Sequence, residues 1–377
     1  MALINYLTRI HFADGVLEEA LRAEVDGLGI KRPLLVTDKG LVEAGLVERA
    51  EAALPAGVAP TLFDGTPSNP TEGAVKQATA LYRSESCDGL IGFGGGSSID
   101  LAKAVGLLVT HDEPLSDYAA IEGGIARIKD RLPPHIAIPT TAGTGSEVGR
   151  GAVITLADGR KLGLISPHLI PKVAICDPTL TLDLPPLLTA ATGMDAMTHC
   201  IETYIATAYN PPADGIALDG LRRAATHIER AVERGSDLTA RREMMAAAMN
   251  GALAFQKGLG GVHAMSHALG GLSGYSLHHG MLNAVLLPHM LAFNGPAVSH
   301  RYADLNRAMA LSGSTDIVDG ISALVRRIGL PMHLADMGVD EQAIDLAAPM
   351  AEKDHTNGTN PRRAGTEDYR ALMQAAL

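Results

Sequence analysis

Two different hydrophobic patterns divide the chain of 377 residues. Before about residue 185, short runs of β-branched or apolar residues alternate with alanine-rich stretches such as SSIDLAKAVGLLV. The apolar runs are RPLLVTD, GLIGFGGG, HIAIPTT and KVAICDP. Short strands that alternate with helices predict an α/β domain with a doubly wound, mostly parallel sheet.

After about residue 185 the strand signals fade, and segments such as LTARREMMAAAMNGALAF predict one helix after another. The sequence therefore predicts an α/β domain over residues 1–185 and an all-α domain over residues 186–377. It contains no internal repeat and no low-complexity linker, so we expect the two halves to pack tightly across a cleft.

Composition narrows the range of partners. The chain has 31 Lys and Arg against 42 Asp and Glu, a formal charge of −11, which disfavours nucleic acid and anionic lipid as partners. Its three cysteines stand far apart, so neither a disulfide framework nor a thiolate zinc site is indicated, and a cytoplasmic setting fits. No signal peptide and no uncharged apolar run of about 18 residues is evident, so we expect no export and no membrane span.

A glycine-rich turn in GLIGFGGGSSIDLAKA suggests phosphate binding. An apolar strand runs into Gly95, Gly96 and Ser97, and a helix follows. Glycines allow close backbone approach, and the N–H groups at a helix N-terminus attract anions. Ile99 stands where the last glycine of G-x-G-x-x-G would be. A tight turn with Ser98 as helix N-cap is an equally good interpretation of this motif alone.

Two further loops favour a dinucleotide. Asp38 ends the run RPLLVTD, where a carboxylate can accept hydrogen bonds from a ribose diol and repel a 2′-phosphate, which favours NAD over NADP. PTTAGTGSE supplies Thr140, Thr141 and Thr144 after another apolar run. Each could be an ordinary polar turn. Three such loops in one sheet favour a dinucleotide site.

Histidines and one aspartate concentrate in the second half. Asp195 and His199 in GMDAMTHCIE are four residues apart, as are His263 and His267 in VHAMSHALGG, and that spacing places each pair on one helix face. For one isolated pair a surface hydrogen bond is the commoner explanation. Two pairs in apolar surroundings, with His279 after a glycine-rich turn, favour a catalytic site for zinc or iron.

Six motifs in order resemble the iron-containing (group III) alcohol dehydrogenase family over nearly the whole chain. They are GGGSSIDLAKA, PTTAGTGSE, LTLDLPPLLTAATGMDAMTHCIE, GVHAMSHALGG, HHGMLNAVLLPH and TNPR. The resemblance implies a dinucleotide-binding α/β domain, a helical domain, and a divalent metal in the cleft between them. It also implies NAD and Fe²⁺ as cofactors, with Zn²⁺ as an alternative metal, and a homodimer or larger homo-oligomer.

The resemblance also assigns residues. It makes His267 a proton-handling or orienting residue near the nicotinamide. The implied metal ligands are Asp195, His199, His263 and His279. The implied cofactor-binding residues are Asp38, Asn69, Gly95, Gly96, Ser97, Thr140, Thr141, Thr144 and Lys161.

Two cations depart from the family pattern. Lys257 in ALAFQKGLGGVHAM stands where a small or neutral residue is commoner, and Arg150 follows the Thr/Gly loop closely. We hypothesise that Lys257, with Arg150, pairs with an acidic substrate, as in the reduction of succinate semialdehyde to 4-hydroxybutyrate. A solvated lysine at a helix end is the alternative, because long cationic side chains usually reach water.

Three rival functions remain open at this point: a maleylacetate reductase, a dehydroquinate synthase-like lyase, and a non-catalytic NAD or metal sensor. The intact ligand set argues against the first, and PTTAGTGSE followed by TGMDAMTHCIE argues against the second. Reduction of the cofactor on addition of an alcohol would exclude the third.

Overall fold

The computed structural model describes residues 4, 6, 8–312 and 315–377, and these form two compact units. One unit is an α/β unit that extends to Thr181, and the other is a helical unit of Leu182–Leu377 that also includes Ala142–Gly145. The assignment of residues 1–185 to dinucleotide binding and of 186–377 to metal binding is a functional division and stays a prediction.

The α/β unit is built on a six-stranded sheet in which all strands are parallel, with the order β1-β8-β5-β4-β2-β3. All four apolar runs form strands of this sheet, which confirms the predicted doubly wound α/β fold. Strands β1 and β3 were not predicted, because β1 is only partly buried and β3 is three residues long. The strands are β1 (Arg9–Phe12), β2 (Pro33–Val36), β3 (Thr61–Phe63), β4 (Gly89–Gly94), β5 (His135–Pro139) and β8 (Val173–Cys176).

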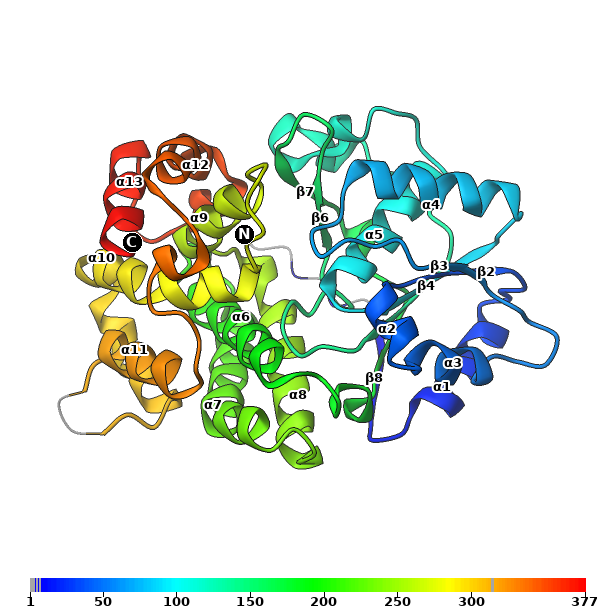
Figure 1. The fold of residues 1–377 in the computed structure, drawn as a ribbon, viewed down its shortest axis with the longest axis horizontal. Coiled ribbons are helices and arrows are strands. Elements are labelled where there is room, and N and C mark those ends of the chain that lie inside the picture. Colours follow the sequence, from blue (N-terminus) through cyan, green and yellow to red (C-terminus); the bar gives the residue numbers. More distant parts are fainter. Residues whose placement is uncertain (1–3, 5, 7, 313–314) are drawn as a thin grey trace. The chain divides into compact units, whose positions relative to one another are not determined.

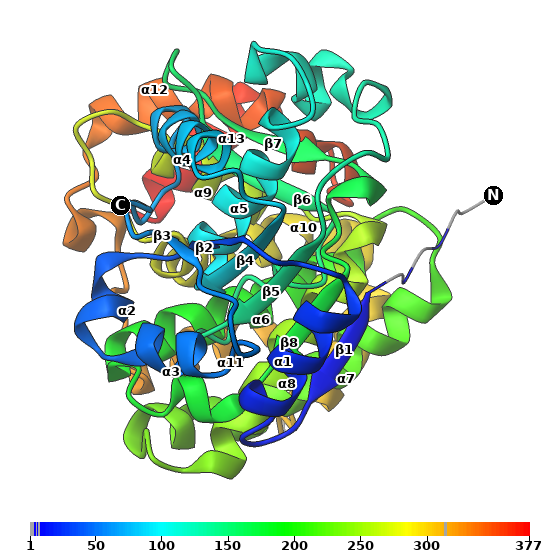
Figure 2. The same cartoon turned by 90° about the vertical axis from the view of Figure 1, so that its right-hand side faces the viewer.

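Helices cover both faces of this sheet (Figures 1 and 2). Both faces of the sheet are apolar, as the alternating side chains of β2 show. Leu34 and Val36 belong to one apolar core, whereas Leu35 belongs to the other. The core of Leu34 includes residues of α4 and α5, and the core of Leu35 includes residues of α1 and α3. The helices are α1 (Leu17–Gly27), α2 (Lys39–Glu43), α3 (Leu46–Ala52), α4 (Glu72–Ser84) and α5 (Gly96–Leu108).

A separate antiparallel hairpin, β6 (Gly151–Thr155) and β7 (Lys161–Ile165), was also not predicted. Its buried residues Ala152, Ile154 and Leu164 join the core that contains α4 and α5. Short 3-10 helices complete this unit at Leu115–Tyr118, Ala120–Glu122, Gly124–Ala126, Pro167–Leu169 and Pro178–Thr181.

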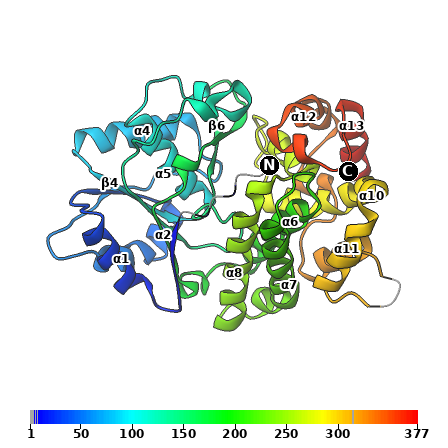
Figure 3. The same ribbon diagram turned by 180° about the vertical axis from the view of Figure 1, so that it is seen from behind.

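The helical unit has no strand among its described residues, as the sequence predicts. Helices α6, α7 and α8 lie side by side, and α12 packs against α13 (Figures 1 and 3). Asn210 and Asp237 cap α7 and α8 through their side chains. The helices are α6 (Pro186–Ile205), α7 (Pro211–Glu233), α8 (Leu238–Ala254), α9 (Gly261–Gly270), α10 (His279–Ala308), α11 (Ile317–Arg327), α12 (Glu341–Lys353) and α13 (Thr366–Ala375), with 3-10 helices at Phe255–Lys257, Leu334–Met337 and His355–Thr359.

Helix α10 is long and apolar enough to cross a membrane by length and composition alone, but 56% of its apolar window is buried inside the protein. It contains Pro288 and Pro296, and Val298 has non-helical backbone angles. It packs against α6, α9 and α11. These contacts are those of a core helix.

Candidate active site

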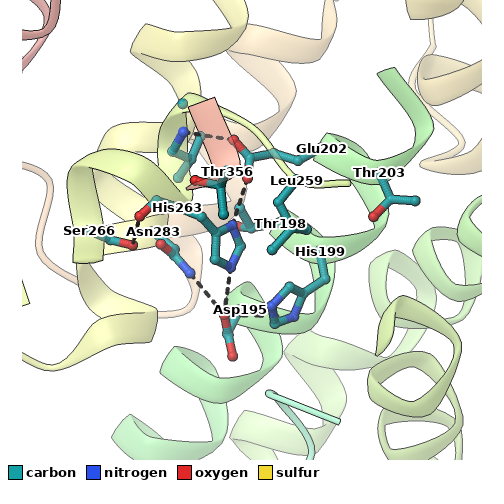
Figure 4. Close-up of polar contacts among 12 residues, drawn as sticks. Asp195, Thr198, His199, Glu202, Thr203, Leu259, His263, Ser266, Asn283 and Thr356 are labelled. Atoms are coloured by element: carbon teal, nitrogen blue, oxygen red, sulfur yellow. Dashed lines mark hydrogen bonds and ion pairs between the residues drawn. The ribbon is translucent and has the colours of Figure 1, made fainter. Parts of the chain in front are cut away.

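Helix α6 supplies the centre of the candidate metal site. The helix is buried on nearly all sides, and Asp195, His199 and Glu202 lie within it at spacings of four and three residues, so they share one face (Figure 4). All three side chains are almost fully buried. Charged and polar groups so deep in a protein require partners, and each of these three faces another polar group.

Three imidazoles converge on a single oxygen of Asp195. Its Oδ1 lies 3.8 Å from Nδ1 of His199 and 3.7 Å from Nε2 of His263. The same Oδ1 lies 3.4 Å from Nε2 of His279. In a tetrahedral site with metal–ligand bonds of about 2.1 Å, neighbouring ligand atoms are about 3.4 Å apart. Helices α6, α9 and α10 thus place the three predicted imidazole ligands around this oxygen, and the donor atoms of Asp195, His263 and His279 lie within 4.8 Å of one another, close enough to share one divalent metal.

Two nitrogen atoms in this cluster show that the donors fit a cation. Nδ1 of His199 and Nε2 of His263 are buried and have no hydrogen-bond partner among the described residues. An unpartnered buried polar atom costs about 1–3 kcal/mol. A cation bound beside Asp195 would be a partner for both lone pairs.

The electrostatics of the cluster also favour a cation. Burial alone would lower the pKa of His263, but the hydrogen bond to Glu202 and the negative charges of Glu202 and Asp195 raise it to about 9. Burial tends to raise the pKa of Asp195, but the imidazoles of His199 and His279 outweigh burial and lower it. Burial is also the main reason why the pKa of His199 is lowered to about 4. The carboxylates of Asp195 and Glu202 therefore stabilise positive charge next to them, either as a proton on an imidazole or as a bound metal ion.

A second layer of residues orients the ligands, and the sequence did not predict it. Nδ1 of His263 lies 2.6 Å from Oε2 of Glu202 (Figure 4). Oε1 of Glu202 accepts a hydrogen bond of 2.7 Å from the amide of Val262. The amide nitrogen of Asn283 donates to Oδ1 of Asp195 at 2.8 Å. Such partners fix the tautomer and orientation of a metal-binding imidazole. The one signal in the sequence was the position of Glu202, seven residues after Asp195 on the same helix face.

His267 lies one turn after His263 on α9. Its ring stacks on that of His279, with centroids 5.5 Å apart and an interplanar angle of 13°. Its Nδ1 lies 3.1 Å from Oδ2 of Asp354, just after α12. The structure thus brings His267 beside a predicted ligand, while its proton-handling role stays a prediction.

In the α/β unit, the glycine-rich turn joins the end of β4 to the start of α5. Gly94 has a φ of +146°, and a Cβ there would lie 2.7 Å from Oγ of Ser98, so the turn requires glycine. The helix begins at Gly96 with Gly95 as its N-cap. The interpretation of Ser98 as N-cap is therefore wrong: Ser98 lies in the first turn and is buried. The backbone amides at a helix N-terminus of this kind can receive a pyrophosphate.

The other predicted cofactor residues of this unit follow strand ends. Thr140 and Thr141 follow β5, and the amide of Thr140 donates to the carbonyl of Gly94 at 3.0 Å. A Cβ at Gly95 would lie 3.5 Å from Thr141. Asp38 follows β2, and its Oδ1 accepts a hydrogen bond from the amide of Leu41 as the N-cap of α2.

Three more of the predicted cofactor residues, Ser97, Asn69 and Lys161, form hydrogen bonds through their side chains. Oγ of Ser97 donates to the carbonyl of Ser68 at 2.6 Å, and Nζ of Lys161 donates to Oδ1 of Asn69 at 2.8 Å. Thr144 belongs instead to Ala142–Gly145, the segment grouped with the helical unit. The structure thus places eight of the nine predicted cofactor residues in the α/β unit.

The structure gives Lys257 a different role from the one hypothesised. Its side chain is fully buried in the helical unit, and Nζ lies 2.5 Å from Oδ1 of Asp214 and donates to the carbonyl of Tyr204 at 2.8 Å. Its charge is therefore compensated within the protein, and neither substrate pairing nor solvation describes it. Arg150 precedes β6 in the α/β unit and is exposed.

Comparison with known proteins identifies the family. Residues 8–178 match the family model for iron-containing alcohol dehydrogenase, and residues 189–377 match the C-terminal model of the Fe-containing alcohol dehydrogenase family. The chain belongs to the iron-containing alcohol dehydrogenase family. It is therefore an NAD-linked oxidoreductase that acts on CH–OH groups and interconverts alcohols and aldehydes.

Relatives with names and structures support this membership. A 4-hydroxybutyrate dehydrogenase of Cupriavidus necator is 55% identical over 384 aligned residues, which cover all of both chains. The crystal structure of a 1,3-propanediol oxidoreductase is 38% identical, covers all of both chains and superposes with a TM-score of 0.93. A sulfoacetaldehyde reductase from Bifidobacterium kashiwanohense, solved in complex with NAD⁺, is 27% identical, with a TM-score of 0.87 over 100% of this chain and 99% of that chain.

Proposed function

We propose that this enzyme is a metal-dependent, NAD-linked reductase of a short-chain aldehyde that carries an acidic group, with succinate semialdehyde and 4-hydroxybutyrate as its substrate pair. The observation that carries the proposal is the convergence of three imidazoles, two of them buried and one partly buried, on Oδ1 of Asp195 in a chain 55% identical to a 4-hydroxybutyrate dehydrogenase. The metal would be held by Asp195, His199, His263 and His279. The cofactor would be held by Asp38, Asn69, Gly95, Gly96, Ser97, Thr140, Thr141, Thr144 and Lys161.

When bound, the divalent metal supplies a Lewis acid for the substrate oxygen, and NAD(H) accepts or donates the hydride. Asp195 contributes the only negative charge among the four proposed ligands, so the occupied site keeps a net positive charge. Glu202 holds His263 with Nε2 free to coordinate. Fe²⁺ suits one carboxylate oxygen with three imidazoles, and Zn²⁺ suits the same donors.

His267 would handle the proton that leaves the alcohol or returns to it. Its ring lies against His279, so it is close to the ligands of the metal that would bind the substrate oxygen. Transfer of the hydroxyl proton to an imidazole leaves an alkoxide, the better hydride donor. In the opposite direction the same imidazole returns the proton to the developing alcohol.

Two relatives support an acidic substrate. The name 4-hydroxybutyrate dehydrogenase denotes a carboxylate substrate, and sulfoacetaldehyde carries a sulfonate. Of the two cations predicted to bind the acidic group, only Arg150 remains in this proposal, because Lys257 is already paired with Asp214. Other relatives are named for uncharged diols, such as the 1,3-propanediol dehydrogenase of Klebsiella pneumoniae, so a general short-chain alcohol dehydrogenase is the alternative.

The test is NADH oxidation by the metal-loaded enzyme with succinate semialdehyde and with butyraldehyde. We expect kcat/KM to favour the acidic aldehyde by at least tenfold, a difference of about 1.4 kcal/mol in transition-state binding. An equal kcat/KM for the two aldehydes, or a higher value for butyraldehyde, would contradict the proposed acidic substrate. The enzyme would then be a general short-chain alcohol dehydrogenase. Turnover of either aldehyde would also separate this protein from a lyase or a non-catalytic sensor.

We also propose a cytoplasmic homodimer or larger homo-oligomer. All three cysteines, Cys87, Cys176 and Cys200, are free and buried, which suits a reducing compartment. Light scattering after size-exclusion chromatography would test the assembly: a mass near the 39.3 kDa of one chain would contradict it.

A further inference from the structure

The imidazole ring of His267 stacks on two other imidazole rings. One belongs to His279, a proposed metal ligand, and the other to His355. The centroids of His267 and His355 are 5.9 Å apart, with an interplanar angle of 17°. A proton-handling role is proposed for His267, so the contacts that fix the position of its ring affect the chemistry.

Asp354 contacts the ring of His267. Its Oδ2 lies 3.1 Å from Nδ1 of His267, and both side chains are 8% exposed. Its other oxygen, Oδ1, accepts hydrogen bonds from the amide of Thr356 at 2.8 Å and from the hydroxyl of Thr356 at 2.6 Å. Asp354 is thus held from one side and binds the imidazole from the other. Nδ1 is the only nitrogen of His267 with a hydrogen bond to a described residue.

The geometry points to Asp354 as the positioning residue of His267, a role that rests on the proposed function of that histidine. A carboxylate 3.1 Å from Nδ1 holds the proton of the neutral imidazole on Nδ1 and leaves the lone pair on Nε2. In alcohol oxidation the substrate O–H bond breaks, an N–H bond forms at Nε2, and the hydride goes to NAD⁺. Asp354 then balances the charge of the imidazolium, and reduction reverses each step.

The same three side chains, His267, Asp354 and His355, could also surround a cation, because their donor atoms lie within 4.8 Å of one another. The hydrogen bonds favour the positioning role instead. Both hydrogen-bond donors of Thr356 point at Oδ1 of Asp354, which leaves Oδ2 to accept from Nδ1 of His267 at hydrogen-bond distance.

A double-mutant cycle tests the proposal. We expect Asp354→Asn to lower kcat at least tenfold with less than a threefold change in KM, because the amide can donate to Nδ1 and favour the wrong tautomer. In a His267→Ala background the same substitution should change kcat by less than twofold, since a positioning residue acts only through its partner. Asp354→Glu should recover part of the loss. Asp345→Asn, an exposed change on α12, is the matched control.

A second readout is independent of turnover. In zinc-loaded protein labelled with ¹⁵N-histidine, the His267 resonances, assigned by their loss in His267→Ala, should show a proton on Nδ1 in the wild type and a shift toward Nε2 in Asp354→Asn. Metal content and melting temperature should remain those of the wild type. An unchanged tautomer in Asp354→Asn would overturn the proposal.

The kinetic outcomes separate this proposal from the proposed function. An equal loss of kcat from Asp354→Asn with and without His267 would show that Asp354 acts independently, and would overturn the positioning role alone. The positioning role would also be overturned if His267→Ala lowered kcat while Asp354→Asn kept the wild-type kcat. A wild-type kcat in His267→Ala would instead overturn the proton-handling role of His267, and with it any role of Asp354 through that residue.

Discussion

Substitution of Glu202 by Gln should weaken metal binding although Glu202 is not a proposed ligand. Both carboxylate oxygens are occupied: Oε2 faces Nδ1 of His263 at 2.6 Å, and Oε1 accepts from the amide of Val262 at 2.7 Å. Glutamine keeps only one acceptor oxygen, so its amide group must face one of these two N–H donors. The charge that fixes the tautomer of His263 is also lost.

The expected loss of metal affinity in Glu202→Gln follows from those two contacts. A hydrogen bond to a charged group contributes about 1.5–3 kcal/mol, and loss of a residue that orients a metal-bound imidazole typically costs about 10–100-fold in affinity. We therefore expect the dissociation constant for Zn²⁺ to rise by about 10–100-fold in Glu202→Gln. The side chain is 1% exposed, so solvent cannot replace the lost partner.

The assay is a competition titration of metal-free protein with a chromophoric chelator at pH 7. Glu233→Gln, an exposed change on α7, is the control and should bind Zn²⁺ as the wild type does. Melting curves of the metal-free proteins would show whether both variants remain folded. A dissociation constant within twofold of the wild-type value, in a variant that is folded, would refute the reasoning about Glu202.

Three further predictions concern stability and cofactor choice. Lys257→Met should lower the free energy of unfolding by about 1.5–3 kcal/mol, because it removes the buried ammonium that donates to half-buried Asp214 and to the carbonyl of Tyr204, while Arg301 still lies 3.4 Å from Asp214; urea unfolding measures this, and the exposed Lys353→Met should have little effect. Burial lowers the pKa of His135 to about 3, so its imidazole stays neutral in the fold while the unfolded chain gains a proton below about pH 6.5. The wild type should therefore lose up to about 2 kcal/mol of stability between pH 7 and pH 5, and His135→Leu should lack that part of the loss; an identical pH dependence of the urea midpoints would contradict this. Asp38→Gly should raise the ratio of kcat/KM for NADPH to that for NADH by at least tenfold, because it removes the carboxylate expected to repel a 2′-phosphate; an unchanged ratio would mean that this carboxylate does not face the ribose.

Local pattern was sufficient to predict much of the fold. The central strand β4 is buried along its whole length and so appears as a continuous apolar run. The edge strands and the hairpin β6–β7 have no such signal, because β1 is partly exposed and β6 alternates between buried and partly buried residues. Their pairing depends on neighbours that only the folded chain supplies.

In the candidate active site too, local spacing was visible in the sequence, whereas contacts between distant segments were not. Asp195 and His199 lie on one helix, so their spacing alone places them on one face. The partners of buried charges were not visible in the sequence, because they come from distant segments: Asp214 is 43 residues from Lys257, and Asp354 is 87 residues from His267. A lysine in an apolar segment looked like a substrate-binding group because its internal partner could not be located.

The central claim is that hydride transfer depends on a metal held by Asp195 and three histidines. The most direct measurement is the rate of NADH oxidation with succinate semialdehyde as Fe²⁺ or Zn²⁺ is added back to metal-free wild type and to Asp195→Ala, with bound metal measured at each point. The account predicts that activity rises with metal until one ion is bound per chain, and that Asp195→Ala neither retains the ion nor regains activity. Full activity of the wild type without bound metal, or of Asp195→Ala with metal added, would contradict it.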